Sequence, residues 1–240
     1  FEGSRGSSNP HEIRIELDDP RPAATHAIDN DPRASRVRIC YLPEDSQIGF
    51  VKSDIKTQLL DAAQRLVQTR GHNGFSFRDL SLEVGIRTAS IHYHFPTKTD
   101  LAVALVRRYR EALGEAMADI AVKKTSLAER LEATAKLYID TLNNDGRVCV
   151  CAALAGEYLS LPREVQTELG KLISDSEGWI VRFLAEGRNR AEITKESDPA
   201  SLARLWYAAL QGGLLLGRAG RAEILDDVAK ALRRLTLNEK

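Results

Sequence analysis

The sequence has few cysteines, no long apolar run and no recognisable catalytic motif. Its 240 residues include only three cysteines, too few and too unevenly placed for a disulfide framework. Apolar stretches stop well short of the roughly 20 residues that cross a bilayer, and no secretory signal opens the chain, so we expect no membrane contact and a cytoplasmic location. Gly-rich phosphate loops, Gly-x-Ser-x-Gly elbows and His-Glu-x-x-His runs are missing, which argues against an enzyme. No metal site and no cofactor are predicted.

The sequence also has no net charge, because 34 basic residues balance 34 acidic ones. The distribution is nevertheless uneven. Residues 52–110 hold ten Lys or Arg and five Asp or Glu, whereas the segments on either side are slightly acidic. The sequence therefore has one basic segment in which a contact with nucleic acid is expected.

Residues 1–50 contain five of the eight prolines, together with scattered Ser, Asn and Asp. This composition does not sustain helical periodicity, and we interpret the segment as an irregular N-terminal extension. Two short alternating runs, 13–17 and 37–41, leave extended strands open as an alternative. The arginines of the extension could reach DNA as an arm, although its acidic balance argues against this. A sequence that opens with Phe1 is compatible with a fragment, a tagged chain or an extended reading frame.

From about residue 53 onward, apolar residues recur at helical spacing and no strand pattern is convincing, which predicts an all-α fold. A first helix is expected over 54–70, stopped by Gly71. A Ser followed three residues later by an acid, Ser76 and Asp79, resembles a capping box and predicts a short second helix that Gly85 ends. A third short helix over 88–95 and a fourth beginning after Pro96 follow.

Two short helices joined by a tight turn, in the one basic segment, match a helix-turn-helix within a domain of residues 51–100. In that arrangement the second short helix enters the major groove. Arg87 could read guanine, Ala89 leaves space for a thymine methyl group, and Thr88 and Ser90 could bond a base or a phosphate. The alternative is a helical interaction module whose basic hairpin binds a protein.

The same segment resembles the DNA-binding domain of the tetracycline-repressor (TetR) family. The resemblance covers residues 53–101 and is most specific over 90–101, with Ile91, the aromatic-His-Phe run 93–95, and Lys98 three residues before Leu101. It implies phosphate contacts from Tyr93, His94 and Lys98 and from the opening of the second helix. The sequence departs from the family at His92, where Tyr is usual. The predicted DNA-binding residues are Ser76, Arg78, Arg87, Thr88, Ala89, Ser90, His92, Tyr93, His94 and Lys98.

The resemblance further implies that the helices of residues 101–240 bind a small-molecule effector and form a homodimer on double-stranded operator DNA. Repression is the function the family implies, with activation open as the alternative. We expect the helices at about 163–188 and 199–218 to form the dimer surface, because small residues allow close approach. Internal packing is the other reading of these residues, which are Ala208, Ala209, Gly212 and Gly213. A shorter helix is predicted over 148–159, with Pro162 in the first turn of the next.

Aromatic residues and cysteines of this second domain are candidates for the effector pocket, and ordinary core packing is the alternative for each. The candidates are Tyr138, Cys149, Cys151, Tyr158, Trp179, Phe183, Trp206 and Tyr207. Thiols in the first turn of a helix beside Arg147 are predicted to have a lowered pKa and to react with electrophiles or oxidants. The alternative is that Cys149 and Cys151 are small buried apolar residues.

Overall fold

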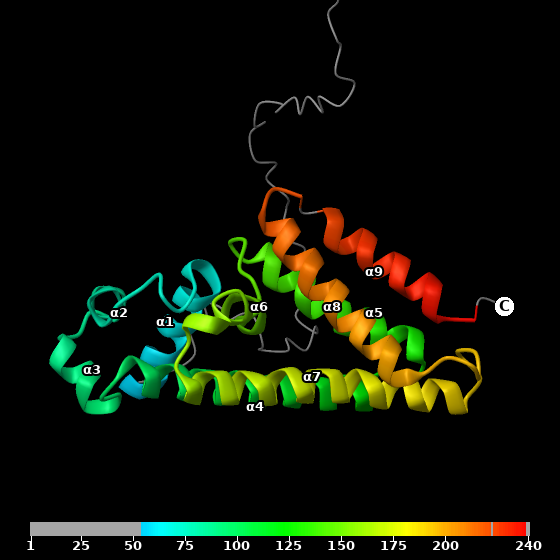
Figure 1. The fold of residues 1–240 in the computed structure, drawn as a ribbon, viewed down its shortest axis with the longest axis horizontal. Helices are drawn as coiled ribbons and strands as arrows, with labels where there is room; N and C mark the ends of the chain where they lie inside the picture. Colours follow the sequence, from blue (N-terminus) through cyan, green and yellow to red (C-terminus); the bar gives the residue numbers. More distant parts are fainter. Residues whose placement is uncertain (1–53, 222, 239–240) are drawn as a thin grey trace, which may run out of the picture. The chain divides into compact units, whose positions relative to one another are not determined.

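The computed structural model describes residues 54–221 and 223–238, all within one unit of the chain, and these residues form helices without a strand. The predicted extension 1–50, with its two candidate strands, lies outside them. The elements, shown in Figure 1, are α1 (Ile55–Arg70), α2 (Phe77–Val84), α3 (Thr88–His94), α4 (Lys98–Lys123), α5 (Leu127–Asn143), α6 (Val150–Ala155), a 3-10 turn (Tyr158–Ser160), α7 (Arg163–Asn189), α8 (Pro199–Arg218) and α9 (Glu223–Thr236). The all-α prediction is confirmed. No helix in the described ranges is long and apolar enough to span a membrane.

The starts of α2, α4 and α5 are fixed by side chains that satisfy free backbone amides. Ser76 and Asp79 form the predicted capping box at α2, and Thr97 with Asp100 forms the same motif at α4. At α5 the motif recurs, with Glu129 as its acid. Each box supplies acceptors to amides that have no partner inside the helix. These three helix starts are therefore defined by local sequence.

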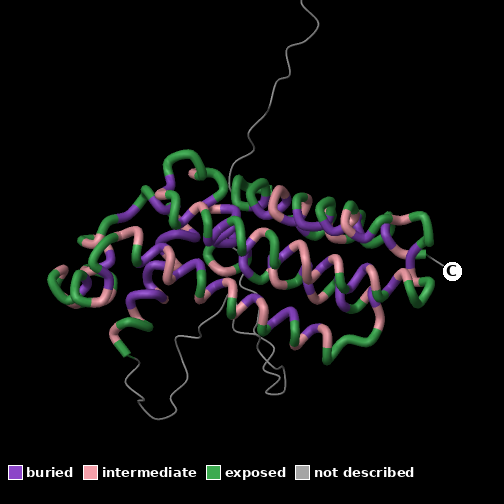
Figure 2. The backbone as a smooth tube through the Cα atoms, turned by 60° about the horizontal axis from the view of Figure 1, so that its bottom comes forward, coloured by how far each residue is buried: buried purple, intermediate pink, exposed green. Residues whose placement is uncertain are grey.

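Each helix turns one apolar face inward (Figure 2), and the buried faces join into one continuous core. The first three helices pack around Leu59, Leu80 and Ile91, all fully buried. Helix α4 contacts both α1 and the long helix α7, which packs in turn on α8, and α8 packs on α9. Figure 1 shows α4 and α7 side by side. Helix α4 thus connects the helix-turn-helix to the remaining helices.

The predicted helix over 148–159 is shorter in the structure. Helix α6 ends at Ala155, and a separate 3-10 turn follows Gly156. Leu159 is 95% exposed, so it contributes nothing to a buried stripe that could extend the helix. Pro162 is the residue that precedes α7 and does not lie within its first turn.

Candidate DNA interface

Helices α2 and α3 are joined at a left-handed glycine. Gly85 has φ 74° and ψ 27°, a conformation that a residue without Cβ adopts at little cost. The Ser81 hydroxyl donates to the Ile86 carbonyl at 2.5 Å and closes the corner. The predicted turn is therefore confirmed, and it sets the direction in which α3 begins.

Helix α3 has one buried and one accessible face. Ile91 is fully buried and Phe95 nearly so, which anchors the helix to the core. On the accessible side, Tyr93 is 85% exposed. Arg87, Ala89, Ser90 and His92 are also exposed, and Thr88 is half-buried. The structure thus brings the residues predicted for the recognition helix onto a surface that a DNA groove can reach.

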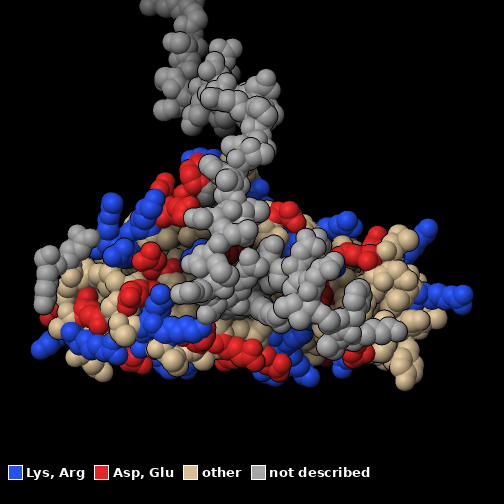
Figure 3. Space-filling view, turned by 180° about the vertical axis from the view of Figure 1, so that it is seen from behind, with Lys and Arg blue, Asp and Glu red and all other residues tan. Residues whose placement is uncertain are grey.

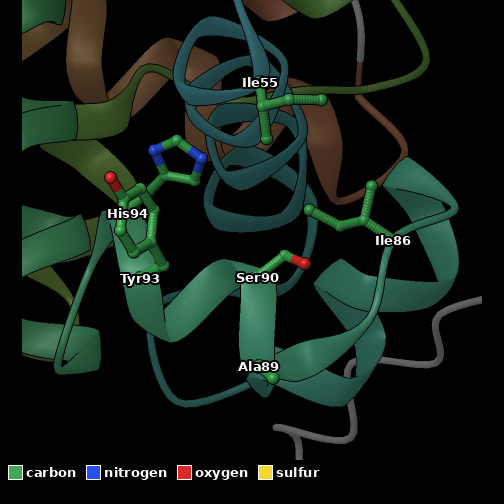
Figure 4. Close-up of a pocket in the computed structure, with 6 residues that line it drawn as sticks. All are labelled: Ile55, Ile86, Ala89, Ser90, Tyr93 and His94. Atoms are coloured by element: carbon green, nitrogen blue, oxygen red, sulfur yellow. The ribbon is translucent and has the colours of Figure 1, made fainter.

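A recess lies beside this surface, between α3 and the first turn of α1 (Figure 4). Its volume is about 460 Å³, and the lining residues are Ile55, Ile86, Ala89, Ser90, Tyr93 and His94. Ile55 and Ile86 make part of the lining apolar, while the side chains of Ser90, Tyr93 and His94 carry polar groups. The hydroxyls of Ser90 and Tyr93 and the imidazole of His94 can donate hydrogen bonds to phosphate oxygens. The chemistry of this recess therefore suits a sugar and its phosphate.

Two residues expected to contact phosphate have intramolecular partners. The Ser76 hydroxyl donates to Asp79 Oδ2 at 2.5 Å as part of the capping box. The Lys98 ammonium donates to the carbonyls of His72 and Phe75 and lies 4.4 Å from the centre of the Phe75 ring. Burial lowers the pKa of Lys98. This structural use of Lys98 could not be predicted from sequence, because its acceptors are main-chain carbonyls.

Charges of both signs are interspersed on the face of the molecule drawn in Figure 3. Figure 3 shows Lys and Arg side chains mixed with Asp and Glu across the face drawn. Several basic residues of the 52–110 segment are paired: Arg65 with Glu83 at 2.9 Å and Arg108 with Asp61 at 2.6 Å. Arg78 and Arg87 are exposed. These two arginines are therefore the better placed cations for DNA in the helix-turn-helix.

Four of the eight predicted pocket residues lie together among the helices beyond α4. The Tyr207 hydroxyl donates to the Cys151 sulfur at 2.9 Å, and Cys149 and Tyr138 lie near enough to act on the pKa of Tyr207. Two further residues, which the sequence analysis did not predict, lie in the same group. Tyr109 donates to the Cys149 sulfur at 3.4 Å, and the Gln211 amide lies 3.8 Å from the same sulfur. We call Tyr109, Tyr138, Cys149, Cys151, Tyr207 and Gln211 the thiol–phenol cluster.

The other four predicted pocket residues are placed elsewhere. The Trp206 indole donates to the Thr236 hydroxyl at 2.8 Å between α8 and α9. Trp179 packs against α4, where a Cβ on Gly114 would lie 3.2 Å from its ring. Phe183 lies under the Arg130 guanidinium at 5.2 Å, and Tyr158 is half exposed on the 3-10 turn. No signal in the sequence separated these from the cluster.

Comparison with known families agrees with this architecture. Residues 59–105 match the model of the bacterial regulatory proteins of the tetR family, and residues 128–232 match the tetracyclin repressor-like C-terminal domain. The chain belongs to the TetR family. It is a DNA-binding transcription regulator of the helix-turn-helix class.

Individual relatives of this TetR-family chain are regulators as well. It is 25% identical over 216 residues to the HTH-type transcriptional repressor KstR2 of Rhodococcus jostii, covering 82% of this chain and 95% of that one. A match to the HTH-type transcriptional regulator LmrA of Bacillus subtilis is 33% identical over 84 residues, 35% of this chain and only 45% of that protein. A TetR-family transcriptional regulator from Agrobacterium tumefaciens has the same fold, with a TM-score of 0.73, 29% identity and coverage of 76% and 97%.

Within this TetR-family member, the predicted lowering of the thiol pKa is wrong for Cys151. Burial raises the pKa of Cys151 to about 12, neighbouring Cys149 adds to the rise, and the hydrogen bond from Tyr207 only partly opposes it. A thiol in an apolar interior holds its proton, whatever its position on the helix. Cys149 is buried too. The interpretation of both cysteines as small core residues therefore describes the structure better.

The small residues of α8 divide between two faces. Gly213 is buried against α9, where an added Cβ would lie 3.0 Å from Leu225, so its expected place at a dimer surface is wrong. Gly212 has open space on its Cβ side, and Ala208 is exposed. Leu205, Leu215 and Leu216 are also exposed, at 49%, 47% and 54%. Helix α8 thus carries an outward apolar strip, made of Leu205, Ala208, Gly212 and Leu215.

Proposed function

We propose that this chain is a repressor that binds a two-fold symmetric operator as a homodimer and leaves it when a small molecule binds among the C-terminal helices. The observation that carries the proposal is the outward apolar strip of α8. Its residues recur at spacings of three and four, so they share one side of the helix. Apolar surface of this kind is unfavourable in water and typically marks an interface.

A second copy of the chain fits this strip better than another partner would. Ala208 has only a methyl side chain and Gly212 has none, so the backbone of an identical helix can approach closely. In a two-fold interface the same patch meets itself, so one self-complementary strip is enough. The dimer would present two copies of α3 about 34–36 Å apart, one turn of DNA, and its operator would be roughly palindromic.

Repression is supported by the relative from Rhodococcus jostii, which is named a repressor and aligns over most of both chains. For the effector we propose the thiol–phenol cluster as the recognition site. Its members come from α4, α5, α8 and the α6 segment, so a ligand bound there would contact several helices at once. The cluster also contains the buried side-chain amide oxygen of Gln211, Oε1, which has no hydrogen-bond partner in the described residues. An effector with mostly apolar surface and one hydrogen-bond donor fits this cluster.

Release of DNA would follow from differential affinity. An effector that binds one arrangement of the helices more tightly shifts the population toward it, and the shift is limited by the ratio of the two affinities. An arrangement in which the two α3 helices no longer match the half-site spacing binds the operator weakly. Reaction with an electrophile is not part of the proposal, because the raised pKa of Cys151 leaves little thiolate.

The dimer proposal is tested with Leu205→Glu on α8 and its matched control Leu235→Glu on α9, where the leucine is 77% exposed. Sedimentation should show a monomer for Leu205→Glu and a dimer for the control. Leu205→Glu should also bind more weakly to a duplex selected by the unmodified chain, because the proposal assigns operator binding to the dimer. A Leu205→Glu chain that stays dimeric and binds normally would contradict the proposed interface.

A further inference from the structure

The C-terminal end of α1 is completed by residues from distant helices. Carbonyls in the last turn of a helix have no partner within it. Here the Val148 amide donates to the Gln68 carbonyl at 3.3 Å. The Arg218 guanidinium, at the end of α8, donates to the carbonyls of Gln68 and Thr69. A cation at this position is also favoured by the helix dipole.

The turn that follows α1 is held from the same side. The backbone amide of Asn73 donates to Glu157 Oε2 at 2.8 Å, and the Asn73 side chain donates to the Ser160 hydroxyl at 2.9 Å. Glu157 and Ser160 lie in the segment between α6 and α7. Residues 68–75, which we call the α1 joint, therefore contact two separate parts of the C-terminal helices.

Gly71 makes room for the Glu157 carboxylate. A Cβ atom at this position would lie 1.8 Å from Glu157 Oε1, which no side chain could tolerate without a shift. Gly71 also has φ +80°, in the region that favours glycine. The contact between the joint and Glu157 is thus a close approach for which both the backbone conformation and the missing side chain are needed.

Lys98 also holds the joint, through the carbonyls of His72 and Phe75. Burial lowers the pKa of Lys98, and the negative charge of Glu157 opposes this effect. Glu157 therefore acts on the joint twice: it accepts a hydrogen bond from Asn73, and it favours the charged form of the lysine that grips the other carbonyls. Glu157→Ala removes the acceptor of the Asn73 amide and this neighbouring negative charge together, whereas Glu157→Gln keeps an acceptor.

We propose that Glu157 and Arg218 are positioning residues for DNA binding. Glu157 lies between α6 and α7 and Arg218 at the end of α8, yet both hold the α1 joint from which α2 departs, and α2 packs directly on α3. This inference rests on the homodimer proposed above: with the joint fixed, α3 has one orientation and the dimer presents two matched recognition helices. With the joint loosened, α3 samples several directions and only a fraction of dimers match the operator at any time.

The test compares Glu157→Ala with Glu115→Ala, which removes the same charge from an exposed site on α4. The probe is a duplex selected by the unmodified chain from a random pool. We expect Glu157→Ala to weaken binding about tenfold, the scale of one hydrogen bond to a charged group, and Glu115→Ala to leave it nearly unchanged. Arg218→Ala should act like Glu157→Ala, with the exposed Arg234→Ala as its control.

Three readouts separate positioning from loss of fold or of DNA contacts. The dependence of binding on salt should keep its slope, because no phosphate contact is removed. Hydrogen exchange should accelerate for residues 76–95 and stay unchanged in α4, α5 and α7. Glu157→Gln, which keeps an acceptor oxygen for Asn73, should retain most of the affinity even where Glu157→Ala lowers the stability of the whole chain.

A double-mutant cycle closes the argument. In a Gly71→Ala background, Glu157→Ala should have a smaller effect than in the unmodified chain, because a Cβ at residue 71 already displaces the carboxylate. Normal affinity and normal exchange in Glu157→Ala would overturn the proposal. So would an equal loss in Glu115→Ala, a changed salt slope, or effects of Gly71→Ala and Glu157→Ala that simply add.

Discussion

The imidazole of His92 meets the ring of Phe77 edge-on, with 5.0 Å between the ring centres. His92 lies on α3 and Phe77 opens α2, so the contact ties the recognition helix to its neighbour. His92 Nδ1 also lies 3.1 Å from the Pro96 carbonyl oxygen. The sequence resemblance singled out this position as a departure from the family pattern, and in this structure His92 has a packing role within the helix-turn-helix.

His92→Ala should therefore weaken operator binding by about three- to tenfold, the scale of one aromatic pair, while His92→Tyr should keep most of the affinity. The reason is that Tyr can preserve the edge-on contact with Phe77. Fluorescence anisotropy with a selected duplex measures both variants. Equal losses for Ala and Tyr would show that the histidine acts through its own hydrogen bond or a base contact.

Substitutions of Arg87 and of Tyr93 should change DNA binding in different ways. Arg87→Ala is expected to relax sequence preference at one base pair of each half-site, at about 1–3 kcal/mol, because a guanidinium reads guanine. Tyr93→Phe removes a hydroxyl predicted to contact phosphate, so binding should weaken by a similar factor for every sequence. Binding to a set of single-base operator variants distinguishes the two patterns. A uniform loss for Arg87→Ala would assign that residue to phosphate.

The thiols of the thiol–phenol cluster should be slow to react. Because the raised pKa of Cys151 leaves almost no thiolate near neutral pH, iodoacetamide should modify it only after unfolding in urea. Peptide mass mapping at each urea concentration reports modification site by site. Rapid labelling of Cys151 in the folded chain, accompanied by release of operator, would instead restore the electrophile hypothesis.

Glu168 should make the fold sensitive to acid. Its carboxylate accepts from Arg107 and Lys171, both at 2.9 Å, and these contacts lower its pKa from 4.5 to about 2. Since the folded pKa lies below the unfolded one, this stabilisation is complete above pH 4.5 and is lost as the pH falls toward 2.

Urea unfolding measured between pH 7 and pH 2 tests the role of Glu168. Glu168→Gln should be less stable than the unmodified chain at pH 7, and the difference should shrink steadily below pH 4.5. The control is Glu164→Gln, at an exposed position of the same helix. Two stability curves that stay parallel down to pH 2 would place the acid sensitivity elsewhere.

Local signals in the sequence predicted much of the helix-turn-helix. The Ser76 and Asp79 capping box, the corner at Gly85 and the exposed start of α3 each follow from a few neighbouring residues, and the structure has all three. Such features depend on backbone conformation and on side chains within one turn. They can be read without knowing what packs against the segment.

Long-range contacts were not predictable in this way. Gly213 and Gly212 are adjacent and identical, yet one is packed on Leu225 and the other faces open space. Similarly, nothing near Lys98 indicated that its ammonium would bind main-chain carbonyls of the α1 joint. Both outcomes depend on which helices meet, and the helical period alone does not determine that.

The central claim is that α3 reads DNA as half of a symmetric dimer. Selection of duplex fragments from a random or genomic pool by the full chain, followed by sequencing, tests it most directly. The account predicts enrichment of one motif with two inverted half-sites whose centres lie about 10 base pairs apart, and loss of the motif in Arg87→Ala. Enrichment of no motif, or of a single unsymmetric site bound equally well by Arg87→Ala, would contradict it.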